Sequence, residues 1–261
     1  MPNRNSSQFF LTNVIKLIMN IFAEILIMKR ISIVSGGSEG LGLALAACLL
    51  KSGKDVLLLG RDCEKLNKAA KKLGRISEKN HVSTLVCNVG KEEEVKKTSE
   101  FLKSHKIAVE YLFNNAGRGL AADVYSATSE LIDKVFEANL KGLILLTTEM
   151  LKVTPEKEEL TIVNIMSTSA LVGRDNESIY CASKWGARGY TEALRSELKG
   201  TKRNIIAVYP GGMKTSFYKV ANKERDISAF MNPRDVAEKI INAVLNADKL
   251  AVTDITINRK K

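Results

Sequence analysis

Short apolar runs alternate along this chain with longer segments in which apolar residues recur every three or four positions. The short runs predict strands over residues 30–35, 55–60, 82–87, 109–117, 160–167, 204–212 and 250–257. The periodic segments predict helices over residues 42–53, 64–74, 91–105, 128–151, 176–198 and 233–247. Apolar strands separated by helices are typical of a parallel sheet that is covered on both faces. The pattern therefore predicts an α/β protein with a doubly wound parallel sheet of about seven strands flanked by helices.

The alternation predicts a single domain over residues 29–261. The chain has 261 residues, and no internal repeat, low-complexity tract or linker interrupts the pattern. Hydrophobic residues make up 45% of the chain and charged residues 26%, which excludes a disordered chain and a collagen-like repeat.

Charge and cysteine content narrow the class of partner. The formal net charge is +11, but Lys and Arg are scattered along the chain, and aromatic residues, at 6%, are too few for a base-stacking surface. We therefore expect no nucleic-acid partner. The four cysteines contain no CxxC pair, so we expect neither a metal site nor a disulfide framework. Free cysteines fit a reducing compartment, and the cytoplasm is the expected location.

Residues 9–28 form the most apolar stretch of the chain. The stretch is about long enough to span a bilayer, but Lys16, Asn20 and Glu24 recur in it at four-residue steps. A spanning helix would bury this polar stripe at a cost of a few kcal/mol per charge. Two interpretations remain open. Residues 1–27 form a helix for a membrane surface or a partner, or they add nothing to the chemistry and Met28 is the natural start, so that residues 1–28 are an extension.

A glycine-rich turn follows the first predicted strand. It runs from Ser35 to Gly42 as SGGSEGLG, directly before the first predicted helix. Such a turn lets backbone amides approach a pyrophosphate, which the positive end of the following helix attracts. The turn therefore predicts a dinucleotide site.

Tyr180 and Lys184 lie four residues apart on one predicted helix face. A phenol has a pKa of about 10 and exchanges protons poorly at neutral pH. A neighbouring ammonium favours the phenolate and lowers that pKa. The pair can therefore donate a proton to a carbonyl oxygen or accept one from an alcohol.

Taken together, these motifs resemble the short-chain dehydrogenase/reductase family, in its single-domain branch, from Arg30 to the C-terminus. Six landmarks of that family occur here in the family's order. They are the glycine turn with Ser35 in place of threonine, the sequence Asn114-Asn115-Ala116-Gly117, Asn139, Ser167 thirteen residues before Tyr180, the Tyr180 and Lys184 pair, and Pro210 to Thr215 as PGxxxT.

The resemblance implies a catalytic tetrad. Tyr180 would be the general acid/base for the substrate oxygen, and Lys184 would lower its pKa and bind the nicotinamide ribose. Ser167 would hold the substrate carbonyl. Asn139 would position a water that links Lys184 to solvent. The hydride moves between nicotinamide and substrate carbon, so the protein supplies orientation and electrostatics.

The resemblance also implies which residues bind the cofactor. Residues 115–117 would line its adenosine side and residues 210–215 its nicotinamide end. Asn88 stands where the family often carries aspartate, and its amide can still accept a hydrogen bond from adenine. The full implied set is Gly36, Ser38, Gly40, Leu41, Gly42, Arg61, Asn88, Val89, Asn115, Ala116, Gly117, Tyr180, Lys184, Pro210, Gly211 and Thr215.

The residues after the second predicted strand bear on the choice of nicotinamide cofactor. Members of the family that prefer NAD carry an acidic residue there, which binds the ribose hydroxyls and repels a phosphate. Here Gly60 occupies that position and Arg61 follows, so a guanidinium is available to a 2′-phosphate. Glu39, in the glycine turn, stands where many NADP-dependent members of the family carry a basic residue, so it argues against NADP(H). Weighing these residues, we expect NADP(H) to be preferred over NAD(H).

The predicted function is the interconversion of a carbonyl and a secondary alcohol on a small-molecule substrate. One alternative is a non-catalytic protein that senses NADP(H), although an intact tetrad argues against it. Another is a reductase of a lipid ketone at a membrane surface, with contact through residues 1–27 only. Residues 216–232 are the least patterned segment, where the family has a mobile loop over the substrate. The resemblance also implies a homodimer or homotetramer.

Overall fold

The computed structural model describes residues 29–77, 79–217, 221, 226–246 and 251–260. The apolar N-terminal stretch at 9–28 lies outside these residues. None of the helices in the described ranges is both long and apolar enough to cross a membrane.

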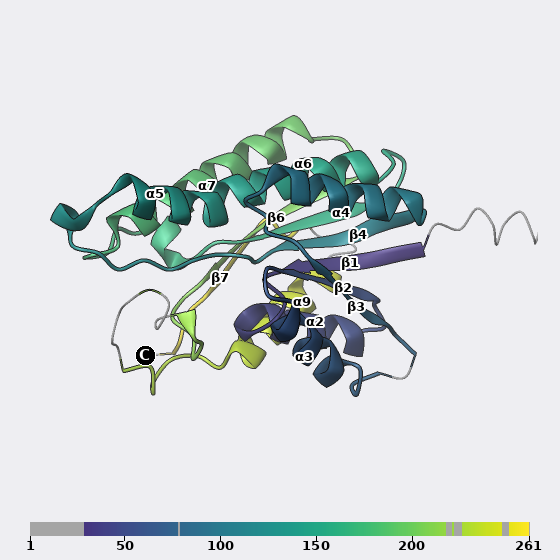
Figure 1. Ribbon diagram of the computed structural model, residues 1–261, viewed down its shortest axis with the longest axis horizontal. Coiled ribbons are helices and arrows are strands. Elements are labelled where there is room, and N and C mark those ends of the chain that lie inside the picture. Colours follow the sequence, from purple (N-terminus) through teal and green to yellow (C-terminus); the bar gives the residue numbers. More distant parts are fainter. Residues whose placement is uncertain (1–28, 78, 218–220, 222–225, 247–250, 261) are drawn as a thin grey trace, which may run out of the picture.

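A single parallel sheet organises the described residues (Figure 1). Its order is β3-β2-β1-β4-β5-β6-β7, and all neighbouring strands are parallel. The seven strands are β1 (Lys29–Ser35), β2 (Val56–Gly60), β3 (Val82–Val86), β4 (Ile107–Asn114), β5 (Leu160–Ile165), β6 (Arg203–Pro210) and β7 (Asp254–Ile257). This confirms the predicted doubly wound α/β fold. It also creates a topological switch point where β1 meets β4, because the chain winds outward from there in both directions.

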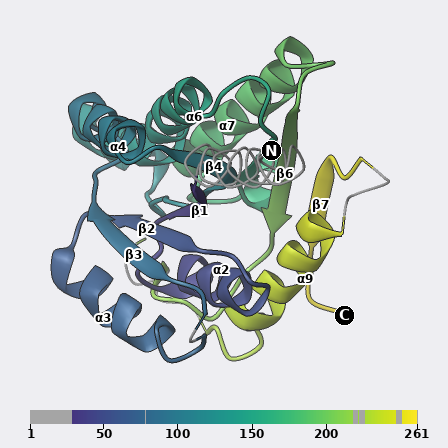
Figure 2. The same ribbon diagram turned by 90° about the vertical axis from the view of Figure 1, so that its right-hand side faces the viewer.

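Helices cover both faces of the sheet (Figure 2). One face carries α2 (Gly40–Lys51), α3 (Cys63–Leu73) and α9 (Pro233–Leu245). The other carries α4 (Glu92–Ser104), α6 (Gly142–Val153) and α7 (Ser178–Glu197). The short helices are α5 (Ser129–Phe136) and the 3₁₀ turns η1 (Val124–Ser126) and η3 (Thr168–Ala170).

Alternation along the central strands explains why each face has its own core. Val34 and Leu58 point to the α2 and α9 side, whereas Ile33, Leu57 and Leu59 point to the α4 and α6 side. All five side chains are almost fully buried. Successive side chains of a strand point to opposite faces, so a strand covered on both faces must be apolar at every position. That is why these strands could be predicted from apolar runs.

Two boundaries differ from the predictions in ways that matter for the site. The predicted helix over 128–151 is interrupted by a π-helical turn, η2 (Glu137–Lys141), which joins α5 to α6 and contains Asn139. The strand predicted over 109–117 ends at Asn114, so residues 115–117 form a loop at the carboxyl edge of the sheet.

Candidate active site

A cavity of about 510 Å³ opens at the carboxyl ends of the strands. Its wall brings together segments far apart in the sequence: the glycine turn, the loop after β4, η3, the start of α7 and the loop after β6. Ser167, Tyr180 and Lys184 line it. The expected cofactor residues that line it are Gly36, Ser38, Gly40, Leu41, Arg61, Asn88, Val89, Asn115, Ala116, Gly117, Pro210, Gly211 and Thr215. Gly42 and Asn139 are absent from the wall and stand behind it.

The glycine turn is shaped by its lack of side chains. Gly36 and Gly40 have φ angles of +63° and +57°, in the left-handed region that favours glycine. A Cβ placed on Gly42 would lie 2.2 Å from the Gly36 carbonyl oxygen, a backbone atom that cannot move aside easily. Helix α2 then begins at Gly40, and its N-cap residue Glu39 makes no capping hydrogen bond with its side chain. The first amides of α2 are therefore available to an anion.

Ser35 and Asn115 tie the glycine turn to the loop after β4. The Ser35 hydroxyl donates to the Phe113 carbonyl at 3.2 Å and accepts from the amides of Asn115 and Ala116, both at 3.0 Å. The Asn115 side chain donates to the carbonyls of Ser35 at 2.9 Å and Gly36 at 3.2 Å. Ser35 was not among the expected site residues, although its place as the threonine of the family motif was a usable signal.

A network of hydrogen bonds between buried side chains holds the residue that precedes this loop. Asn114 donates through Nδ2 to Thr147 Oγ1 and Asn164 Oδ1, both at 2.8 Å, and Asn164 donates to Thr191 Oγ1 at 2.9 Å. These four side chains are almost fully buried and link β4 and β5 to α6 and α7. Nothing in the apolar pattern of the sequence pointed to Asn164, Thr147 or Thr191.

Lys184 is a buried cation beside the Tyr180 ring. Lys184 is only 4% exposed, and its Nζ lies 6.0 Å from the centre of the Tyr180 ring. Nζ donates to the Ile165 carbonyl at 3.2 Å. Burial disfavours the charged form and lowers the pKa of Lys184 to about 8. Spacing along α7 alone predicted this proximity.

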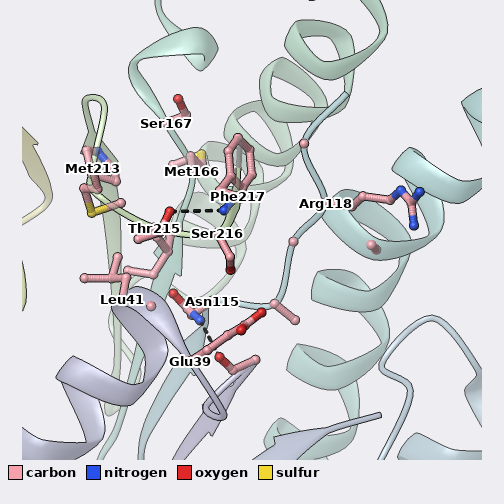
Figure 3. Close-up of a pocket in the computed structure, with 18 of the residues that line it drawn as sticks. Glu39, Leu41, Asn115, Arg118, Met166, Ser167, Met213, Thr215, Ser216 and Phe217 are labelled. Carbon is pink, nitrogen blue, oxygen red and sulfur yellow. Dashed lines mark hydrogen bonds between the residues drawn. The ribbon is translucent and has the colours of Figure 1, made fainter. Parts of the chain in front are cut away.

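Ser167 is the N-cap residue of η3 and lines the same cavity. Its Oγ accepts a hydrogen bond from the Ser169 amide at 3.1 Å, which fixes the hydroxyl at the N-terminus of the turn. Phe217 packs edge-on against Tyr180, with ring centres 5.6 Å apart. Figure 3 shows Ser167 above Met166, with the Phe217 ring beside Met166.

Asn139 sits in the π turn and holds the backbone at Arg118. Its Oδ1 accepts from the Arg118 amide at 2.7 Å, and its Nδ2 donates to the Arg118 carbonyl and to Ser183 Oγ, both at 3.0 Å. A Cβ on Gly117 would lie 3.1 Å from Asn139 Oδ1 and 3.6 Å from Lys184 Nζ. Asn139 and Lys184 therefore flank one glycine, close to each other.

The far end of the cavity lies next to β2 and α3. Arg61 lines it and is exposed, and Asp62 caps α3 by accepting from the Lys65 amide at 3.0 Å. Lys65 also lines the cavity, and its Nζ lies 3.7 Å from Glu39 Oε2. The Glu39 carboxylate, which would repel a phosphate, is thus paired with the Lys65 ammonium. Lys65 had not been singled out from the sequence.

The Asn88 side chain already makes one hydrogen bond within its own turn. Its Oδ1 accepts from the Gly90 amide at 3.2 Å, and its backbone amide donates to Glu94 Oε2 at 2.7 Å. One lone pair of Oδ1 remains for an adenine amino group.

The loop after β6 forms another part of the cavity wall. Met213 and Met231 form an isolated parallel bridge, so the chain just before the least patterned segment lies beside the end of that segment. Phe217 and Phe230 from this segment line the cavity. Residues 218–220 and 222–225 of the expected substrate loop lie outside the described residues.

Comparison with known proteins gives consistent matches. Residues 30–226 match the family model described as short chain dehydrogenase. An uncharacterized oxidoreductase of Staphylococcus aureus is 26% identical over 231 residues, which cover 87% of this chain and 96% of that protein.

Two solved structures extend the comparison. A short-chain dehydrogenase/reductase from Vibrio parahaemolyticus has a TM-score of 0.77 and 33% identity, covering 88% of this chain and 100% of that one. A variant of the actinorhodin polyketide ketoreductase, solved with NADPH, has a TM-score of 0.78 and 27% identity, covering 88% of this chain and 95% of that one.

Proposed function

Because this chain belongs to the short-chain dehydrogenase family and is an NAD(P)-dependent oxidoreductase, we propose that it interconverts a carbonyl and a secondary alcohol, with NADP(H) as cofactor and Tyr180 as general acid/base. The observation that carries the proposal is the shared cavity. Ser167, Tyr180 and Lys184 line the same space as the glycine turn, so a cofactor and a substrate can meet there.

The residues present fit a nicotinamide dinucleotide. The turn at Gly36 and Gly42 leaves no room for side chains, and the free amides at the start of α2 suit a pyrophosphate. The residues that would hold the dinucleotide are those expected from the sequence, together with Lys65. When bound, the dinucleotide supplies or accepts the hydride.

The chain's own part is to hold and move one proton. The Tyr180 hydroxyl would give its proton to the carbonyl oxygen during reduction and take one from the alcohol during oxidation. The Lys184 ammonium, 6.0 Å from the ring centre, favours the phenolate that remains after reduction. Ser167 would donate a hydrogen bond to the same substrate oxygen. Asn139 would act through the backbone it holds at Arg118 and through a water near Lys184.

The preference for NADP(H) rests on the cationic end of the cavity. Gly60 places no carboxylate near the adenosine ribose, and Arg61 and Lys65 line that end. The Glu39 carboxylate lies 3.7 Å from Lys65, which offsets its repulsion of a phosphate. The polyketide ketoreductase solved with NADPH supports the same choice.

The test is a screen of ketones and aldehydes followed by loss of NADPH absorbance at neutral pH, repeated with NADH. We expect turnover of at least one carbonyl, with kcat/KM higher for NADPH. A protein that binds NADPH but reduces no carbonyl would favour the non-catalytic sensor, and a preference for NADH would contradict the cofactor assignment.

A further inference from the structure

Arg174 lines the cavity and is hydrogen-bonded to the turn that directly follows Ser167. Its Nη2 donates to Thr168 Oγ1 at 2.9 Å, and its Nε donates to Ser169 Oγ at 3.2 Å. Thr168 and Ser169 are both buried, although Arg174 itself is exposed. Two hydroxyls thus hold a guanidinium within one turn of the residue expected to bind the substrate carbonyl.

The Arg174 guanidinium has donors left over after these two hydrogen bonds. Arginine has five N–H donors in a planar fork, and two hydroxyls engage only its Nε and Nη2. No described residue accepts a hydrogen bond from Nη1, and no described carboxylate lies within 4.0 Å of the Arg174 nitrogens. A planar fork with free donors matches the two oxygens of a carboxylate.

The nearest acidic group lies behind the Ser169 hydroxyl. Ser169 Oγ accepts from Arg174 and donates to Glu177 Oε2 at 3.4 Å, and Glu177 is only 9% exposed. Glu177 therefore accepts a hydrogen bond from the same hydroxyl that accepts from Arg174, and Glu177 also lines the cavity. The hydroxyl of Ser169 lies between the two charged groups, so Arg174 and Glu177 are not directly paired.

Arg118 and Arg259 also line the cavity. Figure 3 shows the Arg118 side chain extending away from Ser167 and Phe217. Arg259 is an exposed residue near the end of the chain, beyond β7. Arg174 is the arginine joined by hydrogen bonds to the Ser167 turn.

We propose that Arg174 binds a carboxylate of the substrate, so that the protein acts on a short oxo acid or the corresponding hydroxy acid. This proposal rests on the proposed function, because it assigns the substrate class of the same site. Reduction converts the C=O group of the oxo acid to CH–OH, with one hydride from NADPH and one proton through Tyr180. The carboxylate takes no part in the bond changes and serves to orient the ketone. Specificity arises because a neutral analogue leaves the guanidinium without its partner.

The test compares 3-oxobutanoate with its ethyl ester, which keeps the ketone and removes the charge. We measure kcat/KM for both in the wild type, in Arg174→Gln and in Arg174→Lys. The wild type is expected to prefer the acid, and Arg174→Gln to lower the acid-to-ester ratio by about tenfold or more. Arg174→Lys keeps the charge but loses the fork, and an intermediate ratio is expected. The matched control is Arg75→Gln, which removes the same charge at an exposed position outside the cavity wall and should leave the ratio unchanged.

A binding measurement separates this inference from the proposed function. Both compounds are titrated by calorimetry into protein saturated with NADP⁺, where no hydride is available. Tighter binding of the acid, lost in Arg174→Gln, supports the inference. Absence of turnover with every carbonyl would contradict the proposed function, and the titration would still decide the role of Arg174. The inference is overturned if the wild type binds and reduces the ester as well as the acid, or if Arg174→Gln affects both compounds equally, as expected for a residue that only supports the Ser167 turn.

Discussion

The two ends of the cavity are built from different parts of the chain. At the proposed cofactor end, the surface is formed by glycines with positive φ angles, free amides at the start of α2 and the hydrogen bonds of Asn115 to backbone carbonyls. At the proposed substrate end, the surface is formed by side chains that packing or hydroxyls hold in place, namely Tyr180, Phe217 and Arg174. A backbone surface suits the one pyrophosphate group that all nicotinamide dinucleotides share. A side-chain surface can change with each substrate, which is why family resemblance tells more about the first end than the second.

The sharpest separation of the two ends is Tyr180→Phe. The change keeps the ring against Phe217 but removes the hydroxyl, so turnover should fall by about 10²–10⁴-fold. NADPH affinity, measured by fluorescence titration, should stay near that of the wild type. Tyr125→Phe, at a side chain that is 95% exposed, is the control. Retention of more than half of the activity in Tyr180→Phe would rule out the proton-transfer role.

Gly42→Ala changes the other end of the cavity, at the glycine turn. Its Cβ would meet the Gly36 carbonyl oxygen at 2.2 Å, so the turn must shift. Overpacking of this kind costs about 1–3 kcal/mol, and we expect NADPH to bind roughly tenfold to hundredfold more weakly. Gly189→Ala is the control because nothing lies within 4 Å of its added Cβ. Unchanged NADPH affinity in Gly42→Ala would show that the cofactor does not depend on this turn.

Arg61→Ala tests a side-chain contact at the proposed cofactor end, where backbone atoms form most of the surface. We expect about a tenfold loss of NADPH affinity, roughly one charge-assisted hydrogen bond, and almost no change for NADH. Lys68→Ala on α3, outside the cavity wall, is the control. Equal losses for both cofactors would remove Arg61 from the 2′-phosphate site.

The smallest expected effect is on stability, in Lys184→Met. Burial lowers the pKa of Lys184 to about 8, below the ordinary 10.5, so the folded state is penalised wherever the lysine is charged in both states. The variant removes that penalty together with the bond to the Ile165 carbonyl. At pH 7, Tm of the cofactor-free protein should rise by roughly 2–4 °C while turnover is lost.

The pH dependence supplies the check on Lys184→Met. Between pH 8 and 10.5 the folded wild type loses its proton first, so the penalty fades and the difference in Tm should shrink as pH rises. The exposed Lys199→Met is the control and should show neither effect. A Tm that drops at pH 7 would mean that the ammonium contributes more through its hydrogen bond than its burial costs.

The sheet and the catalytic spacing could be predicted because they follow simple periods. Leu57, Leu58 and Leu59 are apolar in succession since both faces are covered, and Tyr180 and Lys184 share a face because they are one helical turn apart. The π turn around Asn139 could not be predicted in this way, because apolar residues recur at helical spacing on both sides of it and the whole segment therefore has the pattern of one helix.

Contacts between distant segments also escaped the sequence. The Glu39 to Lys65 pair and the Asn114 to Asn164 bond join residues that no local period connects. Arg174 lies in an exposed stretch without hydrophobic pattern, and its importance depends on the hydroxyls of Thr168 and Ser169 in three dimensions. Polar contacts of this kind depend on tertiary structure, so composition and periodicity carry little information about them.

The bond between Asn115 and the Gly36 carbonyl has a consequence for how the protein is synthesised. It spans 79 positions of the chain. Strand β1 pairs on one side with β2, the next strand along the chain, and on the other side with β4, which is translated much later. Contacts of such long sequence separation form slowly, because a large loop must close first. The glycine turn therefore acquires its final shape only after Asn115 has been translated, and a nascent chain that ends before it carries the motif without the site. A dinucleotide that binds at this turn, as proposed, would stabilise chains in which β1 and β4 have paired, so cofactor supply in the cell would favour chains that have finished folding.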